Sequence, residues 1–353
     1  MNATLNGFVG RAVLERWHTR MSQPAASCQR SSLLVGVPFT ASDIGAMERG
    51  WRLWQHFPPL LSDSADGPGL LYLFNGRCAG NGSAAAAACG RVQQQMQRMT
   101  HIKGRRAFGR VIFEEAQLSG RSDAYDKRRH SASWTMGPNN MFHHLVQRTR
   151  RLGYRHLLQL EPDVLPIRAG WLERAACLAA TSDAWVIGSA LHANCSHDGR
   201  TGRCERELPE RFAGHINGNA IYAAADEGFA SYYKAARYGQ LKKLPFDLAL
   251  HALRDGYDQP SRRRLMHRFQ HSSFVLNMGT ALPDVAALRA SHPNAYLVHS
   301  SAYGKLAEAE LCRLFGVEDA YQGSYRNLTF LSPVLFPFLL HFFQLKLNDA
   351  ALV

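Results

Sequence analysis

Short apolar runs alternate with amphipathic stretches along most of the chain. Residues 32–37 predict a buried strand, because the run is short, continuous and followed by a proline. The segment from Ser42 to the paired prolines at 58 and 59 predicts a helix, since large apolar side chains recur there every three or four positions. Residues 70–74 predict a second strand, which a β-α-β unit places parallel to the first.

The alternation of strands and helices continues into the last third of the chain. Further helices are expected over residues 83–99, 138–151 and 248–253, and further strands over residues 110–114, 156–160, 184–188, 220–223, 274–277 and 296–299. This order predicts an α/β fold with a mixed, mostly parallel central sheet flanked by helices. We expect an N-terminal extension over residues 1–30, one domain over residues 31–325 and an apolar C-terminal segment over residues 326–353.

The composition is that of an ordinary globular chain. Its 353 residues are 46% hydrophobic and 20% charged, which excludes disorder, collagen and coiled coil as overall descriptions. Lys and Arg number 41 against 28 Asp and Glu, so the formal net charge is +13. Nucleic acid, an acidic membrane surface, acidic glycans and phosphorylated small molecules all fit this charge, and so does a solvated basic surface without an anionic partner.

The cysteines and sequons bear on the cellular compartment. None of the seven cysteines forms a C-x-x-C pair, which argues against a zinc ribbon or a thioredoxin-type motif. Cys195 and Cys204 bracket a glycine-rich turn, and either close a small loop in an oxidising compartment or stay reduced. Four N-x-S/T sequons favour the secretory pathway, at Asn2, Asn81, Asn194 and Asn327.

Two stretches bear on membrane association. The first thirty residues contain no continuous apolar run suited to a signal peptide or an anchor, so we expect either a cytosolic chain or a missing N-terminus. Residues 328–345 are strongly apolar but are broken by two prolines, His341 and Gln344, which favours a buried or membrane-surface segment over a spanning helix. A Golgi or other secretory-lumen location is expected, with the cytoplasm as the alternative.

Two carboxylates directly follow the predicted strand at residues 156–160. Glu161 and Asp163 flank Pro162, so both can address the same small region beyond the end of the strand. In open α/β sheets this is where ligands bind. Carboxylate oxygens suit Mg²⁺ or Mn²⁺, which keep coordination positions open for phosphate oxygens and water. Acid-x-acid triplets are also common as solvated loop charges, so the interpretation depends on the surrounding residues.

Amide and imidazole side chains provide that context. Asn139 and Asn140 stand in the opening turn of a predicted helix, whose free backbone N–H groups suit an anion or a ribose; a plain proline-initiated turn is the alternative. Residues 214–222 join small and amide residues to an apolar strand, which is typical of a close-fitting polar pocket, although an Asn-Gly hairpin turn also fits. The candidate binding residues of this segment are His215, Asn217, Gly218 and Asn219.

Three further residues complete the candidate set. Asp247 precedes an apolar helical stretch, and is either a functional carboxylate or a helix N-cap. His299 ends a predicted strand, and Lys305 follows it closely. Histidine can complete a metal shell and lysine can neutralise a diphosphate, although each is more often structural when it stands alone.

The order of these features resembles that of nucleotide-sugar-dependent glycosyltransferases with the GT-A fold, over roughly residues 33–305. The shared pattern is a β-α-β start, an Asp-x-Asp-like triplet at 161–163, an acceptor-side loop at 215–219, an acid ahead of a helix, and a late strand ending in histidine. Glu161 in place of the first Asp is a departure from the pattern. It weakens the metal assignment for Glu161 more than for Asp163.

The resemblance implies a GT-A-like sheet and specific roles. Asp163 and His299 would hold Mn²⁺ or Mg²⁺, with Lys305 assisting at the diphosphate, while Glu161 would face the ribose or a metal-bound water. Asp247 would be the catalytic base if the reaction inverts the anomeric centre. The implied substrate-binding set is Asn139, Asn140, His215, Asn217, Gly218 and Asn219, and the tryptophans that either stack on a sugar or pack in the core are Trp134, Trp171 and Trp185.

A nucleotide-sugar donor and a glycan or glycoprotein acceptor are the implied partners, with no nucleic acid. Two other classes stay open: an inactive relative that binds a glycan or a protein, and a basic module that binds nucleic acid through residues 103–110 and 127–129. Those basic runs lack the interleaved aromatic residues of a stacking platform. A metal-dependent nucleotidyl or phosphoryl transferase would use the same carboxylates, and the missing G-x-x-x-x-G-K-[ST] sequence argues only against its P-loop kind.

Overall fold

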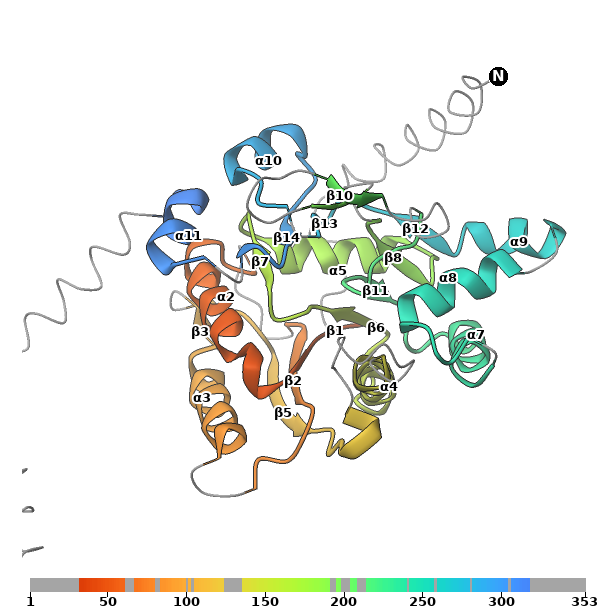
Figure 1. The fold of residues 1–353 in the computed structure, drawn as a ribbon, viewed down its shortest axis with the longest axis horizontal. Helices are drawn as coiled ribbons and strands as arrows, with labels where there is room; N and C mark the ends of the chain where they lie inside the picture. The colour runs from red at the N-terminus through yellow and green to blue at the C-terminus, as the bar shows by residue number, and fades with distance from the viewer. Residues whose placement is uncertain are drawn as a thin grey trace, which may run out of the picture. The chain divides into compact units, whose positions relative to one another are not determined.

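Figure 1 shows the computed structural model of the chain. The structure describes residues 32–60, 67–79, 83–99, 101–102, 105–123, 135–190, 195–197, 204–207, 214–239, 241–256, 259–279, 281–303 and 306–317. By its internal contacts the chain divides into two units, one with residues 1–283 and 287–305 and the other with residues 284–286 and 306–353. Described residues of the second unit form helix α11, Glu308–Phe315. The sheets and the candidate site belong to the first unit.

A seven-stranded sheet forms the centre of the first unit. Its spatial order is β12 (Phe269–His271), β8 (Val186–Gly188), β11 (Ile221–Tyr222), β6 (His156–Gln159), β1 (Leu33–Phe39), β2 (Gly69–Phe74) and β5 (Arg110–Glu115). Neighbouring strands run parallel except at β11, which is antiparallel to both β6 and β8. The predicted α/β class with a mixed, mostly parallel central sheet is confirmed.

Helices cover both faces of this sheet. One apolar cluster includes side chains of α2 (Ile44–His56), α3 (Ala84–Met99) and α5 (Trp171–Thr181), and the other includes side chains of α4 (Met136–Arg151), α7 (Glu227–Tyr238) and α8 (Phe246–Gly256). Strand β1 serves both clusters, with Leu33 and Val35 in the first and Leu34 in the second, as the two-residue period of a strand requires. The described residues also form α9 (Gln259–Met266), α10 (Val285–Ser291) and the 3₁₀ helices η3 (Ala41–Asp43) and η4 (Gly120–Asp123).

Helix α7 is the longest element that the sequence analysis did not predict. Its signal is nevertheless in the sequence. Asp226 caps the helix by accepting a hydrogen bond from the backbone N–H of Phe229, and Phe229, Tyr232 and Tyr233 are buried at helical spacing. The three-residue strand β12 and the short helix α9 were also missed, because neither contains enough residues to establish a period.

A small three-stranded sheet in the same unit supplies part of the candidate site. Its order is β13 (Val275–Asn277), β14 (Leu297–His299) and β7 (Val164–Pro166). Strand β14 runs parallel to β13 and antiparallel to β7, and the register pairs His299 with Asn277 on one side and with Val164 on the other. The turn at residues 161–163 joins β6 of the central sheet to β7, so it connects the two sheets.

Two short antiparallel pairs complete the strands of the described residues: β3 (His101–Ile102) with β4 (Arg105–Arg106), and β9 (Cys195–His197) with β10 (Cys204–Glu207). The backbone register pairs Cys204 with His197 and Cys195 with Glu207, so the two cysteines do not pair with each other across the strands. Their side chains lie outside the described part of the structure. Both alternatives for this pair, a closed loop and two reduced cysteines, therefore stay open.

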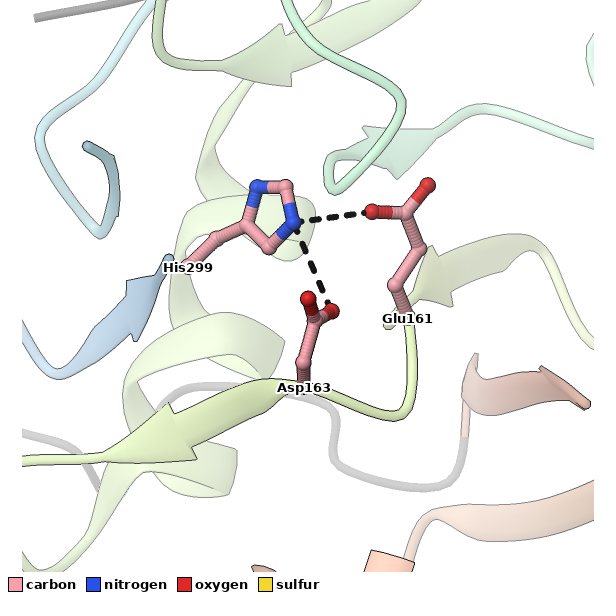
Figure 2. Close-up of side chains that lie close together, drawn as sticks. All are labelled: Glu161, Asp163 and His299. Carbon is pink, nitrogen blue, oxygen red and sulfur yellow. Dashed lines mark ion pairs between the residues drawn. The ribbon is translucent and has the colours of Figure 1, made fainter. Parts of the chain in front are cut away.

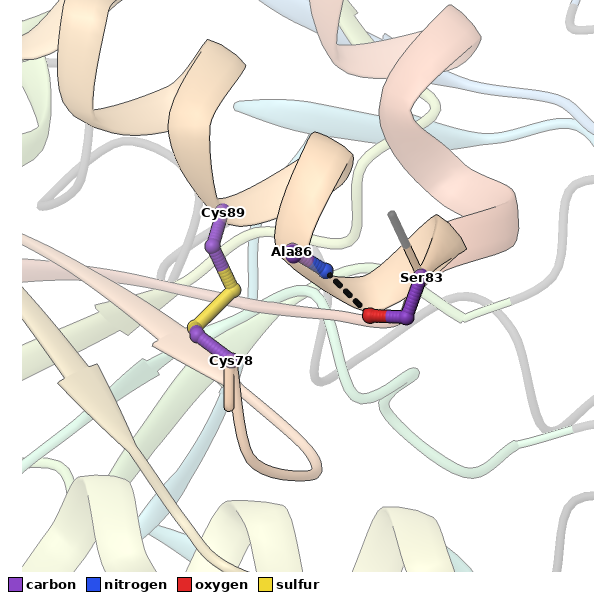
Figure 3. Close-up of a disulfide and its surroundings, with 4 residues drawn as sticks. All are labelled: Cys78, Ser83, Ala86 and Cys89. Carbon is purple, nitrogen blue, oxygen red and sulfur yellow. Dashed lines mark hydrogen bonds between the residues drawn. A yellow bond between two sulfur atoms is a disulfide. The ribbon is translucent and has the colours of Figure 1, made fainter. Parts of the chain in front are cut away.

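A disulfide that the sequence analysis did not predict joins Cys78, which follows β2, to Cys89 in α3 (Figure 3). At the start of the same helix, Ser83 Oγ accepts a hydrogen bond of 3.0 Å from the backbone N–H of Ala86. Side-chain oxygens in this position stabilise helix ends, because the first N–H groups of a helix have no partner within it. Cys177 in α5 is also disulfide-bonded.

Among the described residues, no helix combines the length and the apolar character needed to cross a bilayer. The predicted N-terminal extension, the apolar stretch at residues 328–345 and all four sequons lie outside the described residues. The expectations attached to them, like the predicted domain limits, stay predictions.

Candidate active site

The order of strands reverses at β1. From β1 the chain adds β2 and then β5 on one side, and β6 returns to the other side of β1. The connections that leave β1 and β6 therefore diverge, which opens a crevice beyond the carboxyl ends of these strands. A cleft of about 710 Å³ lies there, lined by Phe39 and Thr40 at the end of β1 and by Glu161 and Asp163 beyond β6. We call it the switch-point cleft.

Glu161 and Asp163 line one edge of the switch-point cleft, and His299 contacts both of them (Figure 2). His299 Nε2 lies 3.0 Å from Glu161 Oε2 and 3.4 Å from Asp163 Oδ1. The strand register explains why they meet, because His299 pairs with Val164, the residue that follows Asp163. The three side chains proposed from the sequence are therefore neighbours, while their roles stay predictions.

Burial and charge have opposite effects on this cluster. Burial lowers the pKa of His299, but its hydrogen bonds and charge interactions with Asp163 and Glu161 outweigh burial and raise that pKa to about 10. Burial raises the pKa of Glu161, yet the hydrogen bond and the charge of His299 outweigh it and the neighbouring Asp163, so the net shift is downward. The two carboxylates hold an imidazolium at neutral pH, which means that they concentrate enough negative charge to attract a cation.

The donor atoms of this cluster suit a divalent cation. One ligand atom from each of the three side chains lies within 4.8 Å of the others. Glu161 and Asp163 have 43% and 25% of their side chains exposed, so an ion here would keep positions open toward the cleft. Carboxylate oxygens suit cations such as Mg²⁺ and Mn²⁺, and an imidazole nitrogen can complete such a ligand set. Among the residues that the structure describes, this is the one group of three or more potential ligands.

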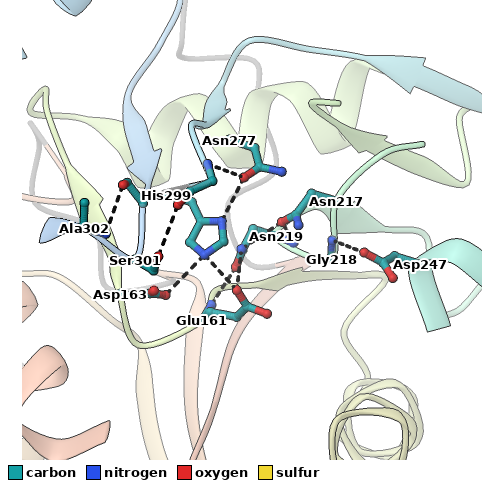
Figure 4. A network of polar contacts seen from close by, with 12 residues as sticks. Glu161, Asp163, Asn217, Gly218, Asn219, Asp247, Asn277, His299, Ser301 and Ala302 are labelled. Carbon is teal, nitrogen blue, oxygen red and sulfur yellow. Dashed lines mark hydrogen bonds and ion pairs between the residues drawn. The ribbon is translucent and has the colours of Figure 1, made fainter. Parts of the chain in front are cut away.

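The loop that precedes β11 forms hydrogen bonds with Glu161 (Figure 4). Asn219 accepts a hydrogen bond of 2.6 Å from the backbone N–H of Glu161 and donates one of 3.0 Å to Glu161 Oε2. Asn217 Oδ1 in turn accepts from both the backbone and the side chain of Asn219. A Cβ at Gly218 would lie 2.9 Å from the ring of Phe246, so any other residue here would push that ring aside. Asn217 and Asn219 thus contact each other, and Asn219 contacts Glu161, while their predicted role as sugar ligands stays a prediction.

Asp247 lies behind the same loop and is not among the residues that line the switch-point cleft. Its Oδ2 accepts from the backbone N–H of Gly218 at 3.1 Å, and its Oδ1 accepts from that of Leu248 at 2.8 Å. His215 Nε2 lies 3.7 Å from Asp247 Oδ2. Burial raises the pKa of Asp247, and His215 and the two N–H groups only partly offset that rise. Of the two roles left open by the sequence, these bonds fit an acceptor for helix and loop N–H groups better than a base.

The remaining predicted substrate ligands do not gather at the acidic edge. Asn139 donates to the carbonyl of Leu244 and accepts from the N–H of Phe246, which ties α4 to the start of α8. Asn140 donates to the carbonyl of Ser122 and accepts from Arg237. Both amides have protein partners for donor and acceptor alike, so the structural alternative fits them. Lys305 lies outside the described residues.

Two of the three tryptophans considered as sugar-stacking or core residues, Trp171 and Trp185, pack against other aromatic side chains. Trp171 is fully buried and packs against Trp54 with ring centroids 5.1 Å apart, so the core-packing alternative is confirmed for it. Trp185 packs against Tyr232 and under the guanidinium of Arg268. Trp134 lies outside the described residues.

Among the polar residues that line the switch-point cleft and that the sequence analysis did not propose for the site are Thr40, Asp43 and Arg49. The backbone N–H and the hydroxyl of Thr40 both donate to Asp43 Oδ2 at 2.7 Å. A signal for them exists, because Thr-x-x-Asp directly after a first strand is a helix-start pattern placed at the carboxyl edge of the sheet.

Comparisons with known proteins find similarity in structure only. No protein-family model matches the chain, and no curated protein sequence matches it. Similar solved structures include the galactosyltransferase LgtC in complex with donor and acceptor sugar analogues, with 13% identity, 80% of this chain and 95% of that chain covered, and a TM-score of 0.39. Another is mouse xyloside xylosyltransferase 1 in its apo form, with 10% identity, 78% of this chain and 99% of that chain covered, and a TM-score of 0.40.

A third similar structure is the mannosyltransferase PcManGT from Pyrobaculum calidifontis in complex with GDP-Man and Mn²⁺, with 13% identity, 95% of this chain and 88% of that chain covered, and a TM-score of 0.34. These structural neighbours are glycosyltransferases. Because all three TM-scores lie at or below 0.40, the function proposed below rests on the geometry of this chain's own site.

Proposed function

We propose that this protein is a metal-assisted glycosyltransferase, which moves a sugar from a nucleoside-diphosphate sugar to a hydroxyl group of a glycan or glycoprotein. The observation that carries the proposal is the Glu161–Asp163–His299 cluster at the edge of the switch-point cleft. A nucleotide sugar needs a site that combines a cation for its diphosphate with a roomy, partly apolar cleft for its rings. The volume and partly apolar lining of the switch-point cleft, together with the potential cation ligands at its edge, support the proposal.

The proposal assigns a role to several residues in or beside the cleft. Asp163, His299 and Glu161 hold the divalent ion, and such an ion when bound neutralises the charge that grows on a departing diphosphate. Arg49 also lines the cleft, and the planar guanidinium group of an arginine suits phosphate oxygens. Phe246, which is half-buried, supplies apolar surface against which a nucleoside or sugar ring packs.

The proposal is tested by thermal unfolding in a panel of nucleotide sugars, each measured with Mn²⁺ and with a chelator. We expect at least one nucleotide sugar to raise the unfolding temperature in Mn²⁺ and not in chelator, because a ligand that binds only the folded state stabilises it. A ligand present at 100 times its dissociation constant adds about 2.7 kcal/mol to the free energy of unfolding. The same nucleotide sugar should then serve as donor in a transfer assay with glycan acceptors.

Two variants match this experiment. Asp163→Asn should lose the Mn²⁺-dependent shift, whereas Asp183→Asn, which changes an exposed acid outside the cleft, should retain it. Stabilisation without sugar transfer to any acceptor would identify an inactive, ligand-binding relative. If no nucleotide sugar stabilises the protein, or if the shift is the same in chelator, the proposed function is contradicted.

We also propose that the protein works in an oxidising compartment, the Golgi or another part of the secretory lumen. The Cys78–Cys89 disulfide and the disulfide of Cys177 support this, since disulfides are rare in reducing compartments. Protein isolated from its native cell and alkylated before reduction should leave Cys78 and Cys89 unmodified, as read by peptide mass spectrometry. Complete alkylation of both would instead place the protein in the cytoplasm.

A further inference from the structure

One backbone N–H group fixes the orientation of the Asn277 amide beside His299 (Figure 4). The N–H of Gly279 points at Asn277 Oδ1 at 3.4 Å, and His299 Nδ1 lies 3.1 Å from the same oxygen. A backbone N–H can only donate, so the atom that faces both groups is the amide oxygen, and His299 Nδ1 must carry a proton. The other ring nitrogen, Nε2, then presents its lone pair toward Glu161 Oε2 and Asp163 Oδ1 whenever the ring is neutral.

The same reasoning fixes Asn219 beside Glu161. The backbone N–H of Glu161 donates to Asn219 Oδ1, so the opposite end of this amide is its NH₂ group. That NH₂ group donates to Glu161 Oε2 and to Asn217 Oδ1. Glu161 Oε2 is therefore held between Asn219 Nδ2 and His299 Nε2, and the carboxylate cannot turn without breaking two contacts.

Both amides are buried and stand outside the cleft. Asn219 is 1% exposed and Asn277 is 4% exposed, and neither lines the switch-point cleft. A substrate in that cleft would therefore meet Glu161 and Asp163 rather than the two amides. Asn219 uses both ends of its amide in hydrogen bonds and Asn277 uses its amide oxygen, so each buried group favours one arrangement of the polar groups that it contacts.

We propose that Asn277 and Asn219 are positioning residues that orient His299 and Glu161 as ligands for a divalent cation. Asn277 selects the tautomer of His299 that leaves Nε2 free for coordination, and Asn219 turns Glu161 Oε2 toward the same point. The inference rests on the metal site of the proposed function. Loss of such a supporting partner typically weakens metal binding by about 10- to 100-fold.

The test is the dissociation constant for Mn²⁺, measured by isothermal titration of metal-free protein. Asn277→Leu removes the acceptor for His299 Nδ1 and should weaken Mn²⁺ binding by about 10- to 100-fold. Asn277→Asp keeps an acceptor at that place and should bind Mn²⁺ close to the wild-type strength. Asn219→Leu should weaken binding by a similar factor, and Asn219→Asp should also weaken it, because a carboxylate cannot donate to Glu161 Oε2.

A matched control separates positioning from loss of structure. Asn75 donates an amide hydrogen bond of 2.7 Å to Asp123 outside the cleft lining, so Asn75→Leu removes one comparable bond and should leave Mn²⁺ affinity unchanged. Circular dichroism of each metal-free variant confirms that it is folded at the temperature of the titration.

The outcomes distinguish this inference from the proposed function. If the wild-type protein binds no Mn²⁺, both the metal-assisted function and the inference are overturned. If the wild type binds Mn²⁺ and the two leucine variants bind it equally well, the inference alone fails. It also fails if Asn277→Asp loses as much affinity as Asn277→Leu, or if Asn75→Leu loses as much as either.

Discussion

The acids at residues 161–163 and Asp247, to which the sequence analysis gave roles in the same reaction, have different hydrogen-bond partners in the structure. At residues 161–163 the carboxylates bond to side chains, His299 and Asn219, and both acids line the switch-point cleft. At Asp247 the carboxylate bonds to the backbone N–H groups of Gly218 and Leu248 and does not line that cleft. Both regions therefore contain carboxylates, but in one the carboxylates contact side chains and in the other the carboxylate accepts hydrogen bonds from backbone N–H groups.

The difference teaches how to separate a ligand-binding acid from a structural one. An oxygen that faces an imidazole at a cleft can exchange that partner for a cation, because the imidazole can lose its proton and become a ligand itself. An oxygen that accepts from a backbone N–H has no such exchange available, since the N–H would be left buried without a partner. We therefore expect changes at Asp163 to affect chemistry and changes at Asp247 to affect folding.

The largest effect is expected for Asp163→Ala. The variant removes a proposed metal ligand, so the rate of sugar transfer with Mn²⁺ should fall by roughly 100-fold or more, while the protein stays folded. Transfer is measured with the donor found in the nucleotide-sugar panel. Asp183→Ala is the matched control and should transfer at the wild-type rate. Unaltered transfer by Asp163→Ala would place the functional acids elsewhere.

The next effect concerns a region without acids, the Cys78–Cys89 disulfide. Replacing both cysteines by serine should lower the free energy of unfolding by about 2–4 kcal/mol, because the crosslink restricts the unfolded chain. Chemical denaturation measures it, with the reduced wild-type protein as the comparison. Mn²⁺ affinity at temperatures where the variant is folded should not change. A variant as stable as the oxidised wild type would show that this pair is not crosslinked in solution.

Asp247→Asn tests the other side of the comparison. One of its two oxygen acceptors is lost, which leaves a backbone N–H without a partner and should lower the free energy of unfolding by about 1–3 kcal/mol. Chemical denaturation gives this value, and donor affinity is measured beside it. A fall in turnover with unchanged stability and intact donor binding would reverse the assignment and make Asp247 the base that the resemblance implies.

Many of the elements that form the candidate site could be predicted from the sequence, because each is a short local pattern. The strand that ends at Gln159, the acids that follow it and the strand that ends at His299 are each visible as short patterns. Their meeting depends on the pairing of β7 with β14, which joins residues far apart in the chain, and no local pattern specifies that register. The proposed neighbourhood of Asp163 and His299 came from the resemblance instead.

The partners of the amide side chains could not be predicted from the sequence. Asn139 looks like a free amide at a helix start, yet its donor and acceptor are used by the carbonyl of Leu244 and the N–H of Phe246, about a hundred positions away along the chain. Asn277 was visible only as the end of a predicted strand, and its contact with His299 follows from the β13–β14 register. Seven cysteines likewise allow many pairings, of which Cys78–Cys89 is only one.

Taken per pH unit, the smallest predicted effect is the pH dependence of Mn²⁺ binding. In the metal-free protein His299 has its pKa raised from 6.5 to about 10, so Mn²⁺ must displace its proton at neutral pH. Affinity should therefore rise with pH, by up to about tenfold per unit, until His299 is neutral without metal. Isothermal titration at several pH values measures it, and His299→Gln should remove the dependence. A flat profile in the wild type would mean that His299 is not a ligand.

The raised pKa of His299 has the opposite consequence for the metal-free protein, whose free energy of unfolding should fall as the pH rises. A raised pKa means that the folded state binds the proton more tightly than the unfolded state does, so this stabilisation is complete below pH 6.5 and is lost as the pH rises toward 10. Denaturation in chelator should therefore give a falling free energy of unfolding over that range, and His299→Gln should reduce the fall.

The central claim, that Glu161, Asp163 and His299 together hold a divalent cation, is tested most directly by crystals grown with Mn²⁺ and recorded at the manganese absorption edge. The account predicts an anomalous peak in the switch-point cleft, about 2.1 Å from an oxygen of Asp163 and from Nε2 of His299. A peak at another place, with His299 still bonded to both carboxylates, would contradict it.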